Sequence, residues 1–144
     1  MNDKLKEMLI KHEGYRTSIY KDSRGIATIG VGHNLISNPL PENMAEYLHD
    51  HGEITIEMLE ELFESDVEKA EASCKRLYVH FPDISENRQN ALIDFVFNVG
   101  EGTARTFKKT NACINASDWD GAAGNMEDSQ WFVQVKGRAK EICH

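Results

Sequence analysis

The sequence has few cysteines, no long apolar run and no excess of basic side chains, and each shortage excludes a class of protein. No window approaches the roughly 18 consecutive apolar residues that a transmembrane helix requires. Residues 1–11 carry charges where a signal peptide needs an apolar segment. The three cysteines fit neither a disulfide framework nor a zinc site. We therefore expect synthesis in the cytoplasm without an export signal, no stable membrane insertion, and buried thiols.

The charge balance is acidic, with 24 acidic and 16 basic side chains and a net charge of -8. Proteins that bind nucleic acid usually present a basic surface, so nucleic acid is not an expected partner. Hydrophobic residues make up 40% of the 144 residues, which is enough for a globular core. A chain of this length is one domain, which can still fold as two lobes around a cleft.

The N-terminal half predicts a helix, a hairpin and two further helices. Apolar residues at helical spacing indicate an amphipathic helix over residues 3–13. The segment 15–35 is rich in β-branched and aromatic residues and is broken by turn residues, which predicts a small antiparallel hairpin or meander. A short helix over 42–50 and a long amphipathic helix from Thr55 to about His80 follow.

The C-terminal half predicts helices only. Ser85 caps a helix whose interior is apolar on nearly every side, so we expect it to be buried all round. Further helices are expected around 107–116, 119–127 and 131–142, with Asp118 as a plausible cap. Together these elements predict an α+β fold that is mostly helical.

A glutamate, an aspartate and a threonine follow one another closely near the N-terminus. Glu13 lies at the end of the first helix, Asp22 in the hairpin turn, and Thr28 at the start of a strand. Cleavage of a glycosidic bond needs one carboxyl that protonates the leaving oxygen and another group that stabilises charge or positions water. The spacing suits that chemistry, but taken alone it also suits residues that merely favour a helix end, a turn and a strand.

The surrounding sequence resembles the lysozymes of T-even phages and their relatives, glycoside hydrolase family 24. The resemblance rests on HEG at 12–14 and KDSRGIATIGVGHN at 21–34, and it continues through RQNALI at 88–93 and VFNVGE at 96–101. It also includes the segments that contain Trp119 and Trp131, so that it extends over about residues 5–142 in the family's order of elements.

The resemblance implies roles for individual residues. Glu13 becomes the general acid, Asp22 the second carboxylate, and Thr28 the residue that helps to hold the attacking water of an inverting hydrolase. Arg138 matches an arginine that pairs with the catalytic glutamate, and His33 with Asp66 matches a structural pair rather than a base or a metal site. Four further positions match residues that line the saccharide cleft, namely Gly32, Phe97, Thr110 and Asn125.

The resemblance also implies an architecture. The expected small lobe covers residues 14–58, and the larger helical lobe combines 1–13 with 80–144. A helix over 56–80 joins the two lobes.

The implied function is that of a muramidase that hydrolyses the β-1,4 bond between N-acetylmuramic acid and N-acetylglucosamine. No metal or organic cofactor is expected, and a monomer is the expected state. Release through a holin to the periplasmic wall during phage lysis is the expected route, and an enzyme carried by a larger particle or encoded by a prophage fits equally. A lytic transglycosylase and an inactive wall-binding relative are the alternatives.

Overall fold

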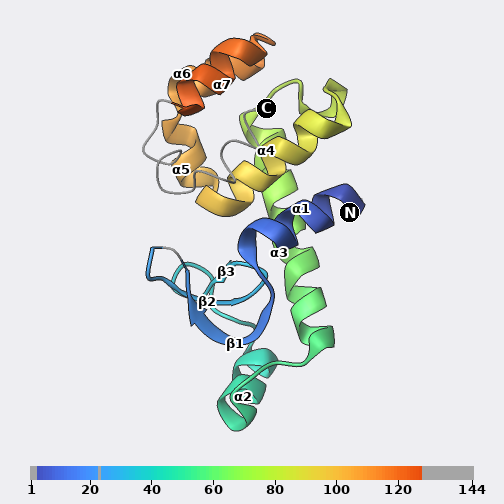
Figure 1. Ribbon diagram of the computed structural model, residues 1–144, viewed down its shortest axis with the longest axis vertical. Coiled ribbons are helices and arrows are strands. Elements are labelled where there is room, and N and C mark those ends of the chain that lie inside the picture. The colour runs from blue at the N-terminus through green and yellow to red at the C-terminus, as the bar shows by residue number, and fades with distance from the viewer. Residues whose placement is uncertain (1–2, 23, 128–144) are drawn as a thin grey trace. The chain divides into compact units, whose positions relative to one another are not determined.

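The computed structural model describes residues 3–22 and 24–127. The predicted α+β class is confirmed, because helices predominate and a small antiparallel sheet lies near the N-terminus (Figure 1). The chain divides into two compact units, residues 1–67 and 68–144. Residues 1–13 belong to the first of these units, so their expected place in a lobe with residues 80–144 stays a prediction.

The first unit begins with a helix and a three-stranded sheet. Its elements are α1 (Asp3–Glu13), β1 (Arg16–Lys21), β2 (Ala27–Gly30), β3 (His33–Asn34) and α2 (Glu42–His51). The strands are antiparallel in the order β1-β2-β3 (Figure 1). Leu5 and Leu9, one turn apart on α1, are both buried, and so is Ile29 of β2. The predicted first helix and meander are therefore confirmed.

The pairing of β1 with β2 contains a bulge. Arg16 is opposite Gly30, whereas Tyr20 is opposite Thr28, so four steps along β1 correspond to two along β2. The half-buried residues of β1, Thr17 and Tyr20, are accordingly three positions apart instead of the two of a regular strand. Bulges redirect side chains, and this one determines where Tyr20 points.

The long helix α3 (Ile56–Leu77) continues from the first unit into the second. The prediction that it reaches His80 was wrong by three residues. The backbone N–H of Val79 donates to the side-chain Oδ1 of Asn115 at 3.2 Å, and so it does not continue the helical pattern. Pro82, which cannot donate a backbone hydrogen bond, then lies in a short 3-10 helix.

The second unit, as far as it is described, is helical. Beyond α3 its elements are η1 (Phe81–Asp83), α4 (Glu86–Val99), α5 (Glu101–Thr106), α6 (Lys108–Asn115) and α7 (Trp119–Glu127). Ser85 caps α4 as predicted, because its side chain accepts the N–H of Arg88. Phe95 of α4 is fully buried and meets the ring of Phe107 edge to face at 5.0 Å between centroids. The predicted core helix of the larger lobe is thus α4.

Some predictions for this half need correction or lie outside the described residues. Helix α5 was not predicted, because its six residues contain a glycine and bury only Ala104. The predicted cap is present, since Asp118 Oδ1 accepts the N–H of Gly121 at 3.0 Å. Of the thiols expected to be buried, Cys74 is buried and Cys113 is partly exposed. The helix expected over 131–142 and Cys143 lie outside the described residues.

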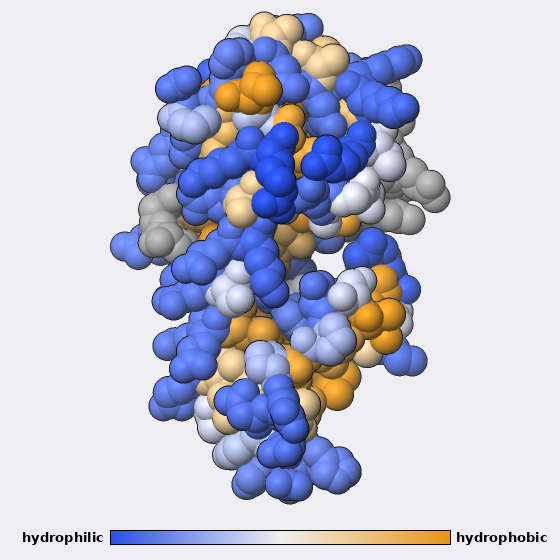
Figure 2. Space-filling model, turned by 180° about the vertical axis from the view of Figure 1, so that it is seen from behind, coloured by the Kyte–Doolittle hydropathy of each residue, from blue (hydrophilic) through white to orange (hydrophobic). Residues whose placement is uncertain are grey.

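The face of the molecule in Figure 2 is mainly hydrophilic, with hydrophobic residues in small patches. Five large apolar side chains are exposed among the described residues: Tyr15, Ile19, Ile36, Ile56 and Val79. None of the helices in residues 3–22 and 24–127 is both long and apolar enough to cross a membrane.

Candidate active site

Glu13 is the last residue of α1, and a glycine ends the helix directly after it. Gly14 has a φ of 81°, which is favourable for glycine and costly for other residues, and its N–H closes the last turn on Ile10 O at 2.9 Å. The backbone carbonyl of Glu13 accepts the hydroxyl of Tyr20 at 3.1 Å. The local sequence thus fixes where the helix stops and where the glutamate side chain begins.

The carboxyl group of Glu13 lies directly against the backbone of Gly32. A Cβ atom built on Gly32 would overlap the Glu13 carboxylate, and Gly32 also has a φ of 67°. The backbone conformation therefore favours glycine at this position, and any side chain here would force the Glu13 carboxyl to move. The structure thus gives Gly32 a place under the candidate acid, while its predicted contact with the saccharide stays a prediction.

Asp22 is held by the turn that it initiates. One carboxylate oxygen, Oδ1, accepts the backbone N–H groups of Arg24 at 2.8 Å and Ile26 at 3.0 Å. The other, Oδ2, lies 3.7 Å from the guanidinium of Arg24. This arrangement, typical of aspartate in turns, fixes the plane of the carboxylate and leaves Oδ2 able to accept another hydrogen bond.

Thr28 is buried in β2, and its hydroxyl donates to the carbonyl of Ile26 at 2.8 Å. Because a hydroxyl has one proton, Thr28 Oγ1 is left with acceptor capacity only. The same Ile26 carbonyl also accepts the backbone N–H of Asp22, and the Ile26 N–H bonds the Asp22 side chain. A single residue, Ile26, therefore orients both Asp22 and Thr28.

Tyr20 is close to both candidate carboxylates, although sequence reasoning did not select it. Burial raises the pKa of Tyr20, the charges of Glu13 and Asp22 raise it further, and a backbone hydrogen bond from Gly32 and the charge of Arg16 lower it. Tyr20 is also opposite Thr28 in the sheet, and its hydroxyl bonds the backbone of Glu13, so this residue lies close to all three candidates. The sequence alone gave little indication of this role, because the direction of the Tyr20 side chain depends on the bulge in β1.

The histidine and aspartate that were expected to pair do so. His33 Nδ1 lies 2.6 Å from Asp66 Oδ2, and His33 Nε2 lies 2.7 Å from the backbone carbonyl of Asn38. A carboxylate and a carbonyl both act as acceptors, so the doubly protonated imidazolium satisfies both contacts. His33 is buried, and these bonds tie β3 to α3.

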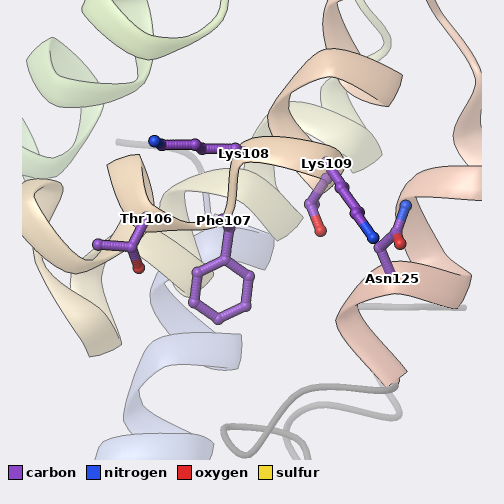
Figure 3. A pocket seen from close by; sticks show the side chains of 6 residues that line it. Thr106, Phe107, Lys108, Lys109 and Asn125 are labelled. Atoms are coloured by element: carbon purple, nitrogen blue, oxygen red, sulfur yellow. The ribbon is translucent and has the colours of Figure 1, made fainter.

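Two of the predicted saccharide-binding residues line one pocket in the second unit. This pocket has a volume of about 410 Å³, and its lining residues are Thr106, Phe107, Lys108, Lys109, Thr110 and Asn125. The side chain of Lys109 extends toward Asn125, whereas that of Lys108 extends away from it (Figure 3). Phe97 is half-buried on α4 and is not among the lining residues. Arg138 lies outside the described residues.

Comparisons with known proteins give consistent matches. The model of the phage lysozyme family matches residues 10–141. The chain is 31% identical over 156 residues to the pre-baseplate central spike protein Gp5 of Enterobacteria phage T4. This match covers 98% of the chain and 27% of that protein. It is 29% identical over 157 residues to the probable T4-type lysozyme 2 of Dictyostelium discoideum, covering 99% of this chain and 92% of that protein. A shorter match, 36% identical over 95 residues, is to the endolysin of Salmonella phage P22, covering 65% of this chain and 58% of that protein.

Proposed function

The chain belongs to the phage lysozyme family, and on that premise we propose that it is a muramidase. The bond cleaved is the β-1,4 linkage between N-acetylmuramic acid and N-acetylglucosamine in bacterial peptidoglycan. The observation that carries the proposal is that Ile26 anchors both Asp22 and Thr28. Tyr20, which is paired with Thr28 in the sheet, donates a hydrogen bond to the backbone of Glu13.

Glu13 serves as the general acid in this proposal. Its proton goes to the glycosidic oxygen as the bond to the anomeric carbon breaks. Asp22 Oδ2 and Thr28 Oγ1 each accept a hydrogen bond from one water molecule, because Oδ1 and the threonine proton are already engaged. With both protons directed to the protein, the lone pair of the water attacks the anomeric carbon, and Asp22 takes up the proton that is released. This geometry favours inversion of configuration.

Saccharide binding involves Gly32, Phe97, Thr110 and Asn125 in this proposal, and Arg138 supports the acid. The pocket that contains Thr110 and Asn125 supports their part of this assignment, since it offers hydroxyl and amide groups to a sugar. No metal or organic cofactor takes part, so chelation of divalent ions should leave the rate unchanged. The enzyme acts as a monomer, which light scattering on the purified chain would test.

We also propose that the enzyme acts on periplasmic peptidoglycan during phage-induced lysis, after release from the cytoplasm through a holin. One of its relatives is named an endolysin, and another is named a pre-baseplate central spike protein. Transport on a larger particle is therefore the second candidate for delivery. Expression of the chain with and without a holin, followed by the turbidity of the culture, separates the two, since only the first route needs the holin.

The enzymatic proposal is tested on purified cell-wall sacculi. Hydrolysis releases muropeptides with ordinary reducing ends, whereas a lytic transglycosylase releases anhydro-sugars that are lighter by one water molecule. Mass spectrometry of the products distinguishes them, and proton NMR at early times reports the anomer formed first. The α anomer is expected for an inverting enzyme acting on a β linkage.

Glu13→Gln provides the decisive variant, because an amide cannot deliver the proton. We expect the rate to fall by about 10²- to 10⁴-fold while circular dichroism shows an intact fold. Asp22→Asn should also be severely impaired, and Thr28→Ala should lose water positioning while the acid chemistry remains. Cleavage by folded Glu13→Gln at the wild-type rate would show that Glu13 is not the acid, and binding of sacculi without any cleavage by the wild type would identify an inactive wall-binding protein.

A further inference from the structure

Tyr20 is bonded to the residue that bears the candidate acid. Its hydroxyl donates to the backbone carbonyl of Glu13 at 3.1 Å, where α1 ends. The carboxyl of the same glutamate rests on the backbone of Gly32. The phenol oxygen thus holds the backbone of Glu13 at the point from which its side chain reaches toward Gly32.

The surroundings of Tyr20 restrict its own freedom. Its ring is half-buried, with the guanidinium of Arg16 5.3 Å from the ring centroid. The pairing with Thr28 in β2 fixes its backbone, and the bulge just before it sets the direction of the side chain. A side chain held in this way can transmit its own position to the groups that it bonds.

We infer that Tyr20 is a positioning residue for Glu13. The phenol hydroxyl ties the C-terminal end of α1 to β1, and this holds the carboxyl of Glu13 over Gly32. Tyr20 itself need not touch the substrate. The inference rests on the proposed function in so far as Glu13 is the acid, but the contacts that carry it do not depend on any substrate.

The change that tests this role is Tyr20→Phe, which removes one oxygen atom and keeps the ring. Misplacement of a reacting group lowers the rate of the chemical step, so kcat should fall by about tenfold to about a hundredfold. KM should stay unchanged, because no contact with the substrate is removed. Both constants are measured on soluble, peptide-bearing glycan chains, well below the melting temperature of each protein.

The matched control is Tyr47→Phe on α2. Tyr47 lies in the same unit and stacks on His51 at 3.9 Å, and its hydroxyl has no hydrogen bond within the part of the chain that the structure describes. This variant should keep the wild-type kcat and KM. If Tyr20→Phe also kept the wild-type kcat while folded, or changed only KM, Tyr20 would not position the acid.

A second measurement needs no turnover and so separates this inference from the proposed function. Carbon NMR of ¹³C-labelled glutamate detects the Glu13 carboxyl, and the loss of the signal in Glu13→Gln assigns it. We expect its chemical shift and its titration midpoint to change in Tyr20→Phe and to stay constant in Tyr47→Phe. An unchanged Glu13 signal in Tyr20→Phe would overturn the positioning role even if the wild type proved inactive, and an inactive wild type with a changed signal would overturn the proposed function alone.

Discussion

The two units hold their candidate functional residues in different ways. In the first unit, backbone groups fix the side chains: two amides hold Asp22, a carbonyl holds Thr28, and the Gly32 backbone lies against Glu13. In the second unit, the pocket is built from side chains of α5, α6 and α7 and from Phe107 between α5 and α6, and its two lysines are exposed. Reacting atoms must be placed within fractions of an ångström, whereas a binding surface tolerates adjustment. This difference is consistent with the roles proposed above, catalysis for the residues of the first unit and saccharide binding for those of the second.

The stability of the two units also rests on different interactions. The second unit packs apolar side chains around α4, where Phe95 is fully buried against Phe107. The first unit combines a small apolar core with the buried polar contact between His33 and Asp66. Substitutions in each region test this contrast.

The largest effect on stability is expected for Phe95→Ala. Removal of a fully buried aromatic ring leaves a cavity and should lower the free energy of unfolding by about 3–5 kcal/mol. Urea unfolding, followed by circular dichroism, measures the change. Val79→Ala in the same unit is the control, because Val79 is 68% exposed and should change stability by less than about 0.5 kcal/mol. Equal effects of the two variants would contradict the picture of an apolar core around α4.

An intermediate effect is expected for His33→Ala. It removes two hydrogen bonds and leaves the Asp66 carboxylate without its imidazole partner, so stability should fall by about 1.5–3 kcal/mol. The kcat of the folded protein should change little, since His33 positions backbone and not reacting atoms. The exposed His49 of α2 serves as the control in His49→Ala. An unchanged melting temperature for His33→Ala at pH 6 would show that the pair does not stabilise the fold.

The smallest effect is expected for Glu101→Gln in the second unit. Hydrogen bonds from Arg76 and Arg105 lower the pKa of Glu101 to about 2. A depressed pKa means that the carboxylate stabilises the fold above its ordinary pKa of 4.5, and that this stabilisation is lost as the pH falls toward 2. The two arginine side chains are exposed and that of Glu101 is partly exposed, so water screens the pairs and the gain is small.

Melting temperatures of wild type and Glu101→Gln, measured from pH 7 down to pH 2, check this prediction. The difference should be constant above about pH 4.5 and vanish toward pH 2. Glu71→Gln is the control, because Glu71 forms a more distant pair with Lys75 at 3.7 Å. A difference that grew as the pH fell would mean that the arginines do not favour the charged carboxylate.

What could be predicted from the sequence was mostly local. Helix α1 and its glycine stop, the Ser85 cap and the turn at Asp22 depend on residues within a few positions of one another. The contact of His33 with Asp66 spans 33 positions and was predicted through family resemblance alone.

What could not be predicted depends on distant partners or weak local signals. The end of α3 depends on a hydrogen bond from Val79 to Asn115, 36 positions away. The direction of Tyr20 depends on a bulge that exists only once β1 pairs with β2. Helix α5 has a single buried residue, too few to show a periodic pattern. Glu13, Asp22 and Thr28 were selected from the sequence as candidates, but the anchoring of Asp22 and Thr28 by Ile26 became visible only in the folded hairpin.

The contact between Glu13 and Gly32 has a consequence for how the sequence can evolve. In a library randomised at both positions, the two sites should not vary independently, because any side chain at position 32 would occupy the space of the Glu13 carboxyl. A shorter residue at position 13 would relieve the overlap, but it would also displace or remove the proposed acid. On the proposed function, selection for lysis should recover glutamate and glycine together. Selection for folding alone should release position 13 but still favour glycine at position 32, because its φ of 67° is costly for other residues.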